Sequence, residues 1–226
     1  MTSASLTAMA FLDAKVKQIV DVLQRTGLEK NATLIIVSDH GFRTYKYKIE
    51  ANVLLREKGL LSAGGVQPVS DVWVMPEGGT AMVYVTNSAR KDELVPELRR
   101  MFSSAEGIEG VYGVEDFAKL GLPTPPETNQ APDLVLAAKP DYMFGNESEG
   151  AFITHTPAAG THGYLNTDPQ MQAIFIAWGA GVPKGIRLGE ISNLDVAPTL
   201  AALLGIEMKG VKGHALKGIG KDIGTP

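Results

Sequence analysis

Two short segments of the chain carry side chains that could bind a metal ion. Asp39 and His40 are adjacent and directly follow the apolar, β-branched run Thr33–Val37. His162 lies between two glycines in the segment Gly160–Tyr164. Ionised carboxylates and neutral imidazoles are ligands that suit zinc, so each segment is a candidate part of a metal site.

Each segment taken alone also permits a structural interpretation. Asp39 could cap the residues that follow it while His40 plays no part, and His162 could be a solvated loop residue. The other two histidines, His155 and His214, lack a comparable setting, and we predict that neither binds a metal. The choice depends on whether the fold brings the segments together.

The elements around these residues predict where they lie. The run Thr33–Val37 is typical of a strand covered on both faces in a parallel sheet, and ligands bind at the carboxyl ends of such strands. Neighbouring side chains of a strand point to opposite faces, so Asp39 and His40 can reach one point only if the chain leaves strand geometry, which Gly41 permits.

The rest of the chain alternates helical and strand patterns, which indicates the α/β class. Helices are predicted at residues 12–23, 49–58, 92–102, 114–120 and 194–204. Strands are predicted at residues 72–75, 81–86, 133–138 and 172–178, the last of them fully buried. Pro76-Glu77-Gly78-Gly79 is a turn signal between the first two of these strands.

Composition excludes several classes of protein. The 226 residues contain no cysteine, so disulfides, thiolate metal sites and thiol catalysis are ruled out. A formal net charge of −4 argues against a nucleic-acid-binding surface, and no apolar run is long enough for a membrane span. The first ten residues make a poor signal peptide, and the cellular location stays open.

Several motifs, in the right order, resemble the type I phosphodiesterase/nucleotide pyrophosphatases, a family of the alkaline phosphatase superfamily. Val37–Phe42 is similar to the second metal motif of that family, and Gly160–Tyr164 to the segment with its last metal-binding histidine. Met171–Gly181 resembles the strand and glycine turn that follow. Asp195–Leu200 and then Leu203–Ile206 resemble the C-terminal helix of the family.

The resemblance implies part of an alkaline-phosphatase-like α/β fold, with a mostly parallel sheet sandwiched by helices. Residues 1–44 and 160–226 would form the core, and residues 45–159 an inserted α+β cap that selects the substrate. It further implies two divalent metal ions, expected to be zinc, roughly 3.5–4 Å apart. Asp39 and His40 would bind the zinc that holds the nucleophile, and His162 would bind the other.

The implied function is a metal-dependent phosphohydrolase for a phosphodiester or nucleotide-like small molecule. We identify no catalytic residue, because the family places its nucleophilic Thr or Ser, a further metal-binding Asp and an Asp/His motif ahead of the helix at 12–23, which would put them upstream of Met1. The chain therefore resembles the C-terminal portion of such an enzyme, and we expect it to hydrolyse phosphodiesters poorly by itself.

Two alternatives remain open. The chain could be a non-catalytic remnant, or a half that associates with another chain, including a homo-oligomer through an exposed sheet edge. It could also share the superfamily but act as a phosphonate hydrolase, a sulfatase or a phosphosugar mutase.

Overall fold

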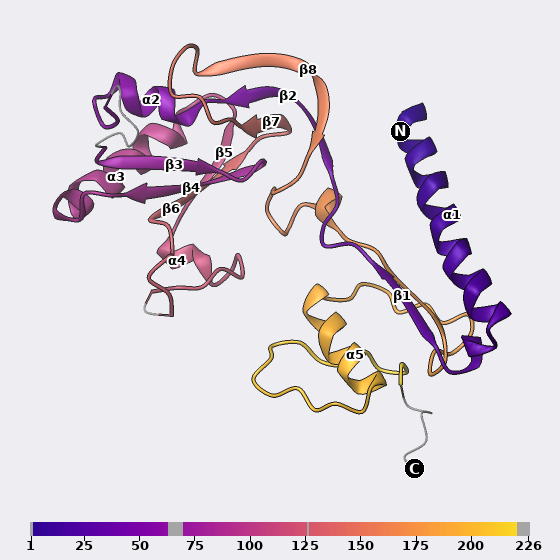
Figure 1. Cartoon of the computed structure of the whole chain (residues 1–226). Coiled ribbons are helices and arrows are strands. Elements are labelled where there is room, and N and C mark those ends of the chain that lie inside the picture. Colours follow the sequence, from indigo (N-terminus) through magenta and orange to yellow (C-terminus); the bar gives the residue numbers. More distant parts are fainter. Residues whose placement is uncertain (1, 63–69, 126, 221–226) are drawn as a thin grey trace. The chain divides into compact units, whose positions relative to one another are not determined.

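A computed structural model describes residues 2–62, 70–125 and 127–220. The chain divides into two compact units. Unit 1 comprises Met1–Asp39 and Ala173–Pro226, and unit 2 comprises His40–Gln172. Figure 1 labels the α-helices and the strands β1–β8.

Unit 1 holds a long helix, a pair of strands and a short C-terminal helix. Its elements are α1 (Ser3–Arg25), the 3-10 turn η1 (Leu28–Lys30), β1 (Thr33–Val37), β9 (Phe175–Gly179), the 3-10 turn η4 (Asn193–Asp195) and α5 (Val196–Leu203). The Thr2 hydroxyl caps the first turn of α1 by accepting from the Ser5 N–H, and the Ser5 hydroxyl accepts from the Thr2 N–H in return. This reciprocal cap starts the helix nine residues earlier than the periodicity predicts.

The pairing of β1 differs from the sequence prediction. β1 pairs with β9 in antiparallel register, with Thr33 opposite Gly179 and Val37 opposite Phe175. The predicted parallel pairing is wrong, because a continuous apolar run does not fix the direction of the neighbouring strand. The predicted coverage of β1 on both faces is also wrong, since none of its residues is buried and Val37 is 46% exposed. The predicted complete burial of the second strand is also wrong, since Ile176 and Trp178 are 53% and 39% exposed.

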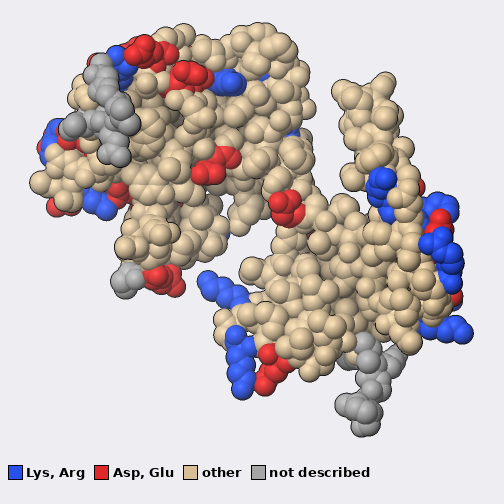
Figure 2. Space-filling view, viewed as in Figure 1, with Lys and Arg blue, Asp and Glu red and all other residues tan. Residues whose placement is uncertain are grey.

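Helix α1 buries none of its residues, although its apolar side chains recur at helical spacing. Its exposed large hydrophobic residues are Leu6, Met9, Phe11, Leu12, Ile19 and Val22. The first charged residue of α1 is Asp13, so its N-terminal turns present an uncharged surface (Figure 2). Among the residues that can be described, no helix combines the length and the apolar character needed to cross a membrane.

The described residues of unit 2 form two sheets and three α-helices. Its elements are β2 (Arg43–Ile49), α2 (Ala51–Glu57), β3 (Val72–Pro76), β4 (Thr80–Val85), the 3-10 turn η2 (Ser88–Arg90), α3 (Lys91–Ser103), β5 (Ile108–Gly113), α4 (Val114–Phe117), β6 (Leu134–Ala138), β7 (Asp141–Phe144), β8 (Ile153–Thr161) and the 3-10 turn η3 (Pro169–Met171). One sheet has the strand order β7-β2-β8 and the other β3-β4-β6-β5.

The described ladders are mainly antiparallel, which differs from the expected mostly parallel sheet. Only β2 and β7 pair in parallel among the strands that the structure describes, and β2–β8, β3–β4, β4–β6, β5–β6 and β1–β9 are antiparallel. The turn Glu77–Gly79 joins β3 to β4 directly, and a connection that short can only join antiparallel neighbours. The mixed α/β content agrees with the predicted class.

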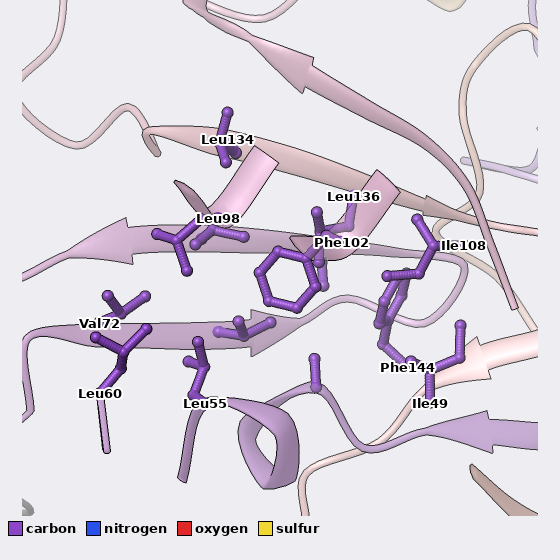
Figure 3. Packing of buried hydrophobic residues seen from close by; sticks show 14 of the residues in the cluster. Ile49, Leu55, Leu60, Val72, Leu98, Phe102, Ile108, Leu134, Leu136 and Phe144 are labelled. Atoms are coloured by element: carbon purple, nitrogen blue, oxygen red, sulfur yellow. The ribbon is translucent and has the colours of Figure 1, made fainter. Parts of the chain in front are cut away.

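The core of unit 2 lies between its larger sheet and the helices α2 and α3 (Figure 3). Leu94, Leu98 and Phe102 project from one face of α3 and are fully buried. They pack with residues of the sheet strands, among them Val72, Leu134 and Leu136 (Figure 3). The helix predicted at 92–102 is confirmed, and burial of its apolar stripe is the main reason that it is stable.

An asparagine covers the outer edge of the larger sheet. β3 is the terminal strand of its order, so the backbone of Val74 has one side without a strand partner. The Asn52 side chain of α2 takes that place, because its amide donates to the Val74 carbonyl at 2.8 Å and its oxygen accepts from the Val74 N–H at 3.0 Å. Asn52 is 1% exposed, so it closes this edge within the protein interior.

Candidate metal centre

The antiparallel ladder of β2 and β8 brings the two candidate histidines together. The ladder pairs Arg43 with Thr161 and Thr44 with Gly160. His40 stands three residues before the first of these pairs and His162 one residue after it, so both lie at the same end of the ladder. The pairing of two distant strands thus brings His40 and His162 together, as the motifs suggested.

The imidazoles of His40 and His162 lie face to face. Their ring centroids are 4.3 Å apart and the ring planes are inclined by 20°. The ring of Phe42 borders both of them edge-on, at 5.4 Å from His40 and 5.9 Å from His162. His162 is exposed and His40 half-buried, so the pair is accessible from solvent on one side.

The backbone around His40 fixes the direction of its ring. The Nδ1 atom lies 2.9 Å from the Gly41 carbonyl oxygen, which can only accept, so Nδ1 carries the proton in this contact. That tautomer leaves the lone pair on Nε2, as in most metal-binding histidines. Gly41 donates its N–H to the Met171 carbonyl at 3.0 Å, and a Cβ at position 41 would lie 2.0 Å from the Gln170 carbonyl oxygen.

The residue after His162 is held in the left-handed region of the backbone. Gly163 has a φ of +73°, and a Cβ built there would lie 1.8 Å from the Glu77 carbonyl oxygen. A side chain is therefore excluded both by conformation and by space. β8 extends to Thr161, so the segment Gly160–Tyr164 is strand in its first two residues and leaves the strand at His162.

Asp39 is the last residue of the N-terminal segment of unit 1. Its carbonyl oxygen accepts from the Asn193 side-chain amide at 2.8 Å, which ties the end of the β1 segment to the residues before α5. Asp39 is exposed to solvent. That Asp39 shares a metal with His40 stays a prediction from the sequence.

The donor chemistry fits zinc, whereas the number of donors falls short of a complete site. Two imidazoles in contact and one neighbouring carboxylate in the chain are nitrogen and oxygen ligands of the kind that zinc takes. Yet no group of three or more His, Cys, Asp or Glu side chains gathers into a metal cage within residues 2–62, 70–125 and 127–220. His40 and His162 could each supply one ligand, and a catalytic zinc needs about three from protein.

A cavity of about 500 Å³ in unit 2 is lined in part by residues next to the histidine segments. Arg43 and Tyr164 both line it, and the Arg43 guanidinium lies 5.3 Å above the Tyr164 ring and forms an ion pair with Asp168. Tyr164 donates to the Tyr142 carbonyl at 2.6 Å. Burial raises the pKa of Tyr164 to about 12, against the opposing effect of the Arg43 cation.

The sequence prediction gave no role to Phe42 or Tyr164, which end the two motif segments, and did not include Arg43 or Asp168 in this region. Phe42 and Tyr164 flank the predicted histidines within two residues, and that proximity was the available signal. Asp168 gave none, because its role depends on an ion pair with a residue 125 positions away. The remaining two histidines stand elsewhere: His155 packs edge-on against Tyr47 of the same sheet, and His214 lies in unit 1.

The family model of the type I phosphodiesterases/nucleotide pyrophosphatases matches residues 3–165. The chain therefore belongs to this family of hydrolases. Its fold is similar to that of human ectonucleotide pyrophosphatase/phosphodiesterase 5, with a TM-score of 0.69 and 19% sequence identity. The likeness covers 94% of this chain and 51% of that one, so the chain spans about half the length of that structure. No curated protein matches the sequence.

Proposed function

We propose that this chain contributes the residues Asp39, His40 and His162 to a two-zinc phosphohydrolase of the nucleotide pyrophosphatase/phosphodiesterase type. The substrate would be a phosphodiester or nucleotide-like small molecule. The observation that carries the proposal is the face-to-face contact of His40 and His162, at 4.3 Å between ring centroids, in a chain of this family. Residues 45–159 would act as the cap that selects the substrate.

The roles of these residues follow from their chemistry. When bound, the two metal ions would polarise the phosphoryl oxygen and lower the pKa of an attacking hydroxyl or water. The Gly41 carbonyl holds the proton of His40 on Nδ1, the arrangement in which a backbone carbonyl orients a metal-binding imidazole. Phe42 places an apolar ring beside both imidazoles, in T-shaped contact with each.

Part of the machinery would come from outside these 226 residues. Two histidines and one aspartate cannot fill two zinc sites, and the proposed nucleophile, a Thr or Ser, has no counterpart among the matched motifs. We therefore expect weak zinc binding and slow turnover from this chain alone.

Zinc titration of histidine variants tests the proposal. Isothermal titration calorimetry on the full chain should give a zinc affinity that falls at least about tenfold in His40→Ala and in His162→Ala. His155→Ala is the matched control, because it removes a histidine from β8 that packs on Tyr47. Equal losses in all three variants, or unchanged affinity in the first two, would contradict the proposed ligands.

Substrate comparison separates the related chemistries. Turnover of bis(p-nitrophenyl) phosphate with zinc, set against phosphonate and sulfate esters, should favour the phosphodiester. Faster cleavage of the sulfate or phosphonate ester would support a sulfatase or phosphonate hydrolase, and turnover of none of them would leave the zinc titration as the test of the metal site.

A second candidate function is association with another copy of this chain through unit 1. The apolar side of α1 and the outward residues Ile176 and Trp178 of β9 are exposed, and β1 and β9 form a sheet of two strands among the residues that the structure describes. Strand edges of this kind pair readily, and a two-fold axis lets one edge pair with itself. Analytical ultracentrifugation should then show a dimer that Leu12→Glu and Ile176→Lys each weaken, and a monomer at every concentration would refute it.

A further inference from the structure

We propose that Thr80 is a positioning residue for the imidazole of His162, acting through the backbone of the turn between β3 and β4. This inference rests on the proposed function, which gives His162 the task of binding a metal. It concerns a residue of the predicted cap segment that no sequence motif singles out, and it is drawn from contacts within unit 2.

The turn between β3 and β4 hydrogen-bonds to two consecutive carbonyls on the C-terminal side of His162. The Gly79 N–H donates to the His162 carbonyl at 2.8 Å. The Thr80 hydroxyl donates to the Gly163 carbonyl, also at 2.8 Å. With both carbonyls bonded, the two peptide planes that follow the His162 Cα cannot rotate freely, and the direction of its side chain depends on them.

The turn itself is anchored on other strands. The Glu77 N–H donates to the Thr80 carbonyl at 2.9 Å, which closes the turn. The Gly78 carbonyl accepts from the Phe144 N–H at 2.7 Å and the Gly79 carbonyl from the Ala138 N–H at 2.9 Å. Because these partners lie at the ends of β7 and β6, the turn is continuous with both sheets of unit 2 and can serve as a fixed reference for His162.

Close packing leaves the loop little alternative. Gly163 is in the left-handed region, directly against the Glu77 carbonyl, and the ring of Tyr164 lies against Gly79. In this arrangement the Thr80 hydroxyl bonds the loop through a side chain, whereas the bond from Gly79 to His162 uses backbone groups. It is therefore the contact that a side-chain substitution can remove while the backbone bond between Gly79 and His162 is kept.

Nuclear magnetic resonance of the full chain provides the test. The wild-type chain should show nuclear Overhauser effects between the ring protons of His40 and His162, because their centroids are 4.3 Å apart. Thr80→Val keeps the shape but removes the donor, and these effects should be lost. Thr80→Ser keeps the donor and should restore them. Thr80→Ala repeats the test if the valine variant does not fold.

The matched control is Thr86→Val. Thr86 follows the other end of β4, and its hydroxyl also donates to a backbone carbonyl, that of Ser70. The Thr80 hydroxyl bond is part-buried and the Thr86 hydroxyl bond is exposed, so the melting temperature should fall more in Thr80→Val than in Thr86→Val. Only Thr80→Val should alter the histidine rings and weaken zinc binding, by about tenfold. A merely structural role of Thr80 would affect the melting temperature and leave the ring contacts in place.

The outcomes separate this inference from the proposed function. Ring contacts that depend on Thr80 in a chain that binds no zinc would support the positioning role and refute the metal site. A zinc affinity that is unchanged in Thr80→Val would refute the positioning role alone. Absence of the ring contacts in the wild-type chain, persistence of them in Thr80→Val, failure of Thr80→Ser to restore them, or their loss in Thr86→Val would each overturn the inference.

Discussion

Replacing Gly163 by alanine should destabilise unit 2 far more than the same replacement at Gly59. The two glycines have almost the same backbone angle, with φ of +73° and +72°. At Gly59 nothing lies within 4 Å of a built Cβ, so alanine there meets only the left-handed penalty, about 1 kcal/mol. At Gly163 the Cβ would lie 1.8 Å from the Glu77 carbonyl oxygen, so the turn or the loop must move.

The magnitude follows from adding a packing cost to the conformational one. Forcing an extra methyl group into a filled site costs about 1–3 kcal/mol, so Gly163→Ala should lose about 3 kcal/mol of unfolding free energy in total. The restriction that alanine imposes on the unfolded chain is the same in both variants and cancels in their difference. We thus expect a difference of about 2 kcal/mol between them.

Urea unfolding measures this difference. The chain has two tryptophans, Trp73 in unit 2 and Trp178 in unit 1, so a Trp178→Phe background lets fluorescence follow unit 2 alone. The His40–His162 ring contacts should also be lost in Gly163→Ala and kept in Gly59→Ala. Losses in unfolding free energy that agree within about 0.5 kcal/mol would refute the argument that the Glu77 carbonyl fills the space beside Gly163.

Three further predictions concern the same unit. Phe102→Ala should cost about 3–5 kcal/mol in urea unfolding, because this ring is fully buried, whereas Met75→Ala, at a side chain 45% exposed on β3, should cost about 0.5 kcal/mol or less. Asn52→Ala should cost about 2–3 kcal/mol in the same assay, because it leaves the Val74 N–H and carbonyl without partners, and a cost below about 0.5 kcal/mol would contradict the edge-covering role. Stability of unit 2 should fall as the pH rises from about 10 towards 12, because burial raises the pKa of Tyr164 to about 12 from its ordinary value of 10.0 and the fold favours the neutral phenol. That contribution is complete below pH 10 and lost above the folded-state pKa, so Tyr164→Phe should flatten the decline in the urea midpoint, and an equally steep decline in the variant would contradict this assignment.

The elements with a strong local pattern were predictable from the sequence. β1 occupies Thr33–Val37 as predicted, and α3 and β4 differ from their predicted bounds by one residue at each end. Local periodicity suffices for α3 and β4 because each buries one face of its own sequence. β1 is marked by its run of β-branched and apolar residues. The Pro76–Gly79 turn signal likewise marks the true connection between β3 and β4.

Two strands were missed for different reasons. β2 has the sequence RTYKYKI, in which tyrosine and lysine alternate with the period of a strand, a signal that the prediction overlooked. β8 contains Pro157 and Gly160, both of which disfavour a strand. β2 and β8 form because they pair with each other over a long ladder. The local sequence of a strand does not reveal a partner that lies about 100 residues away. The candidate histidines were recognisable by their motifs, yet their contact depends on that same ladder and became visible only in the fold.

The closure of the larger sheet by Asn52 has a consequence for how copies of this protein could meet. A strand arriving at β3 would have to displace an amide that already pairs both outward groups of Val74 and is sealed from water. Growth of the sheet from one molecule into the next is thereby stopped at this border, and any self-assembly must begin elsewhere on the surface.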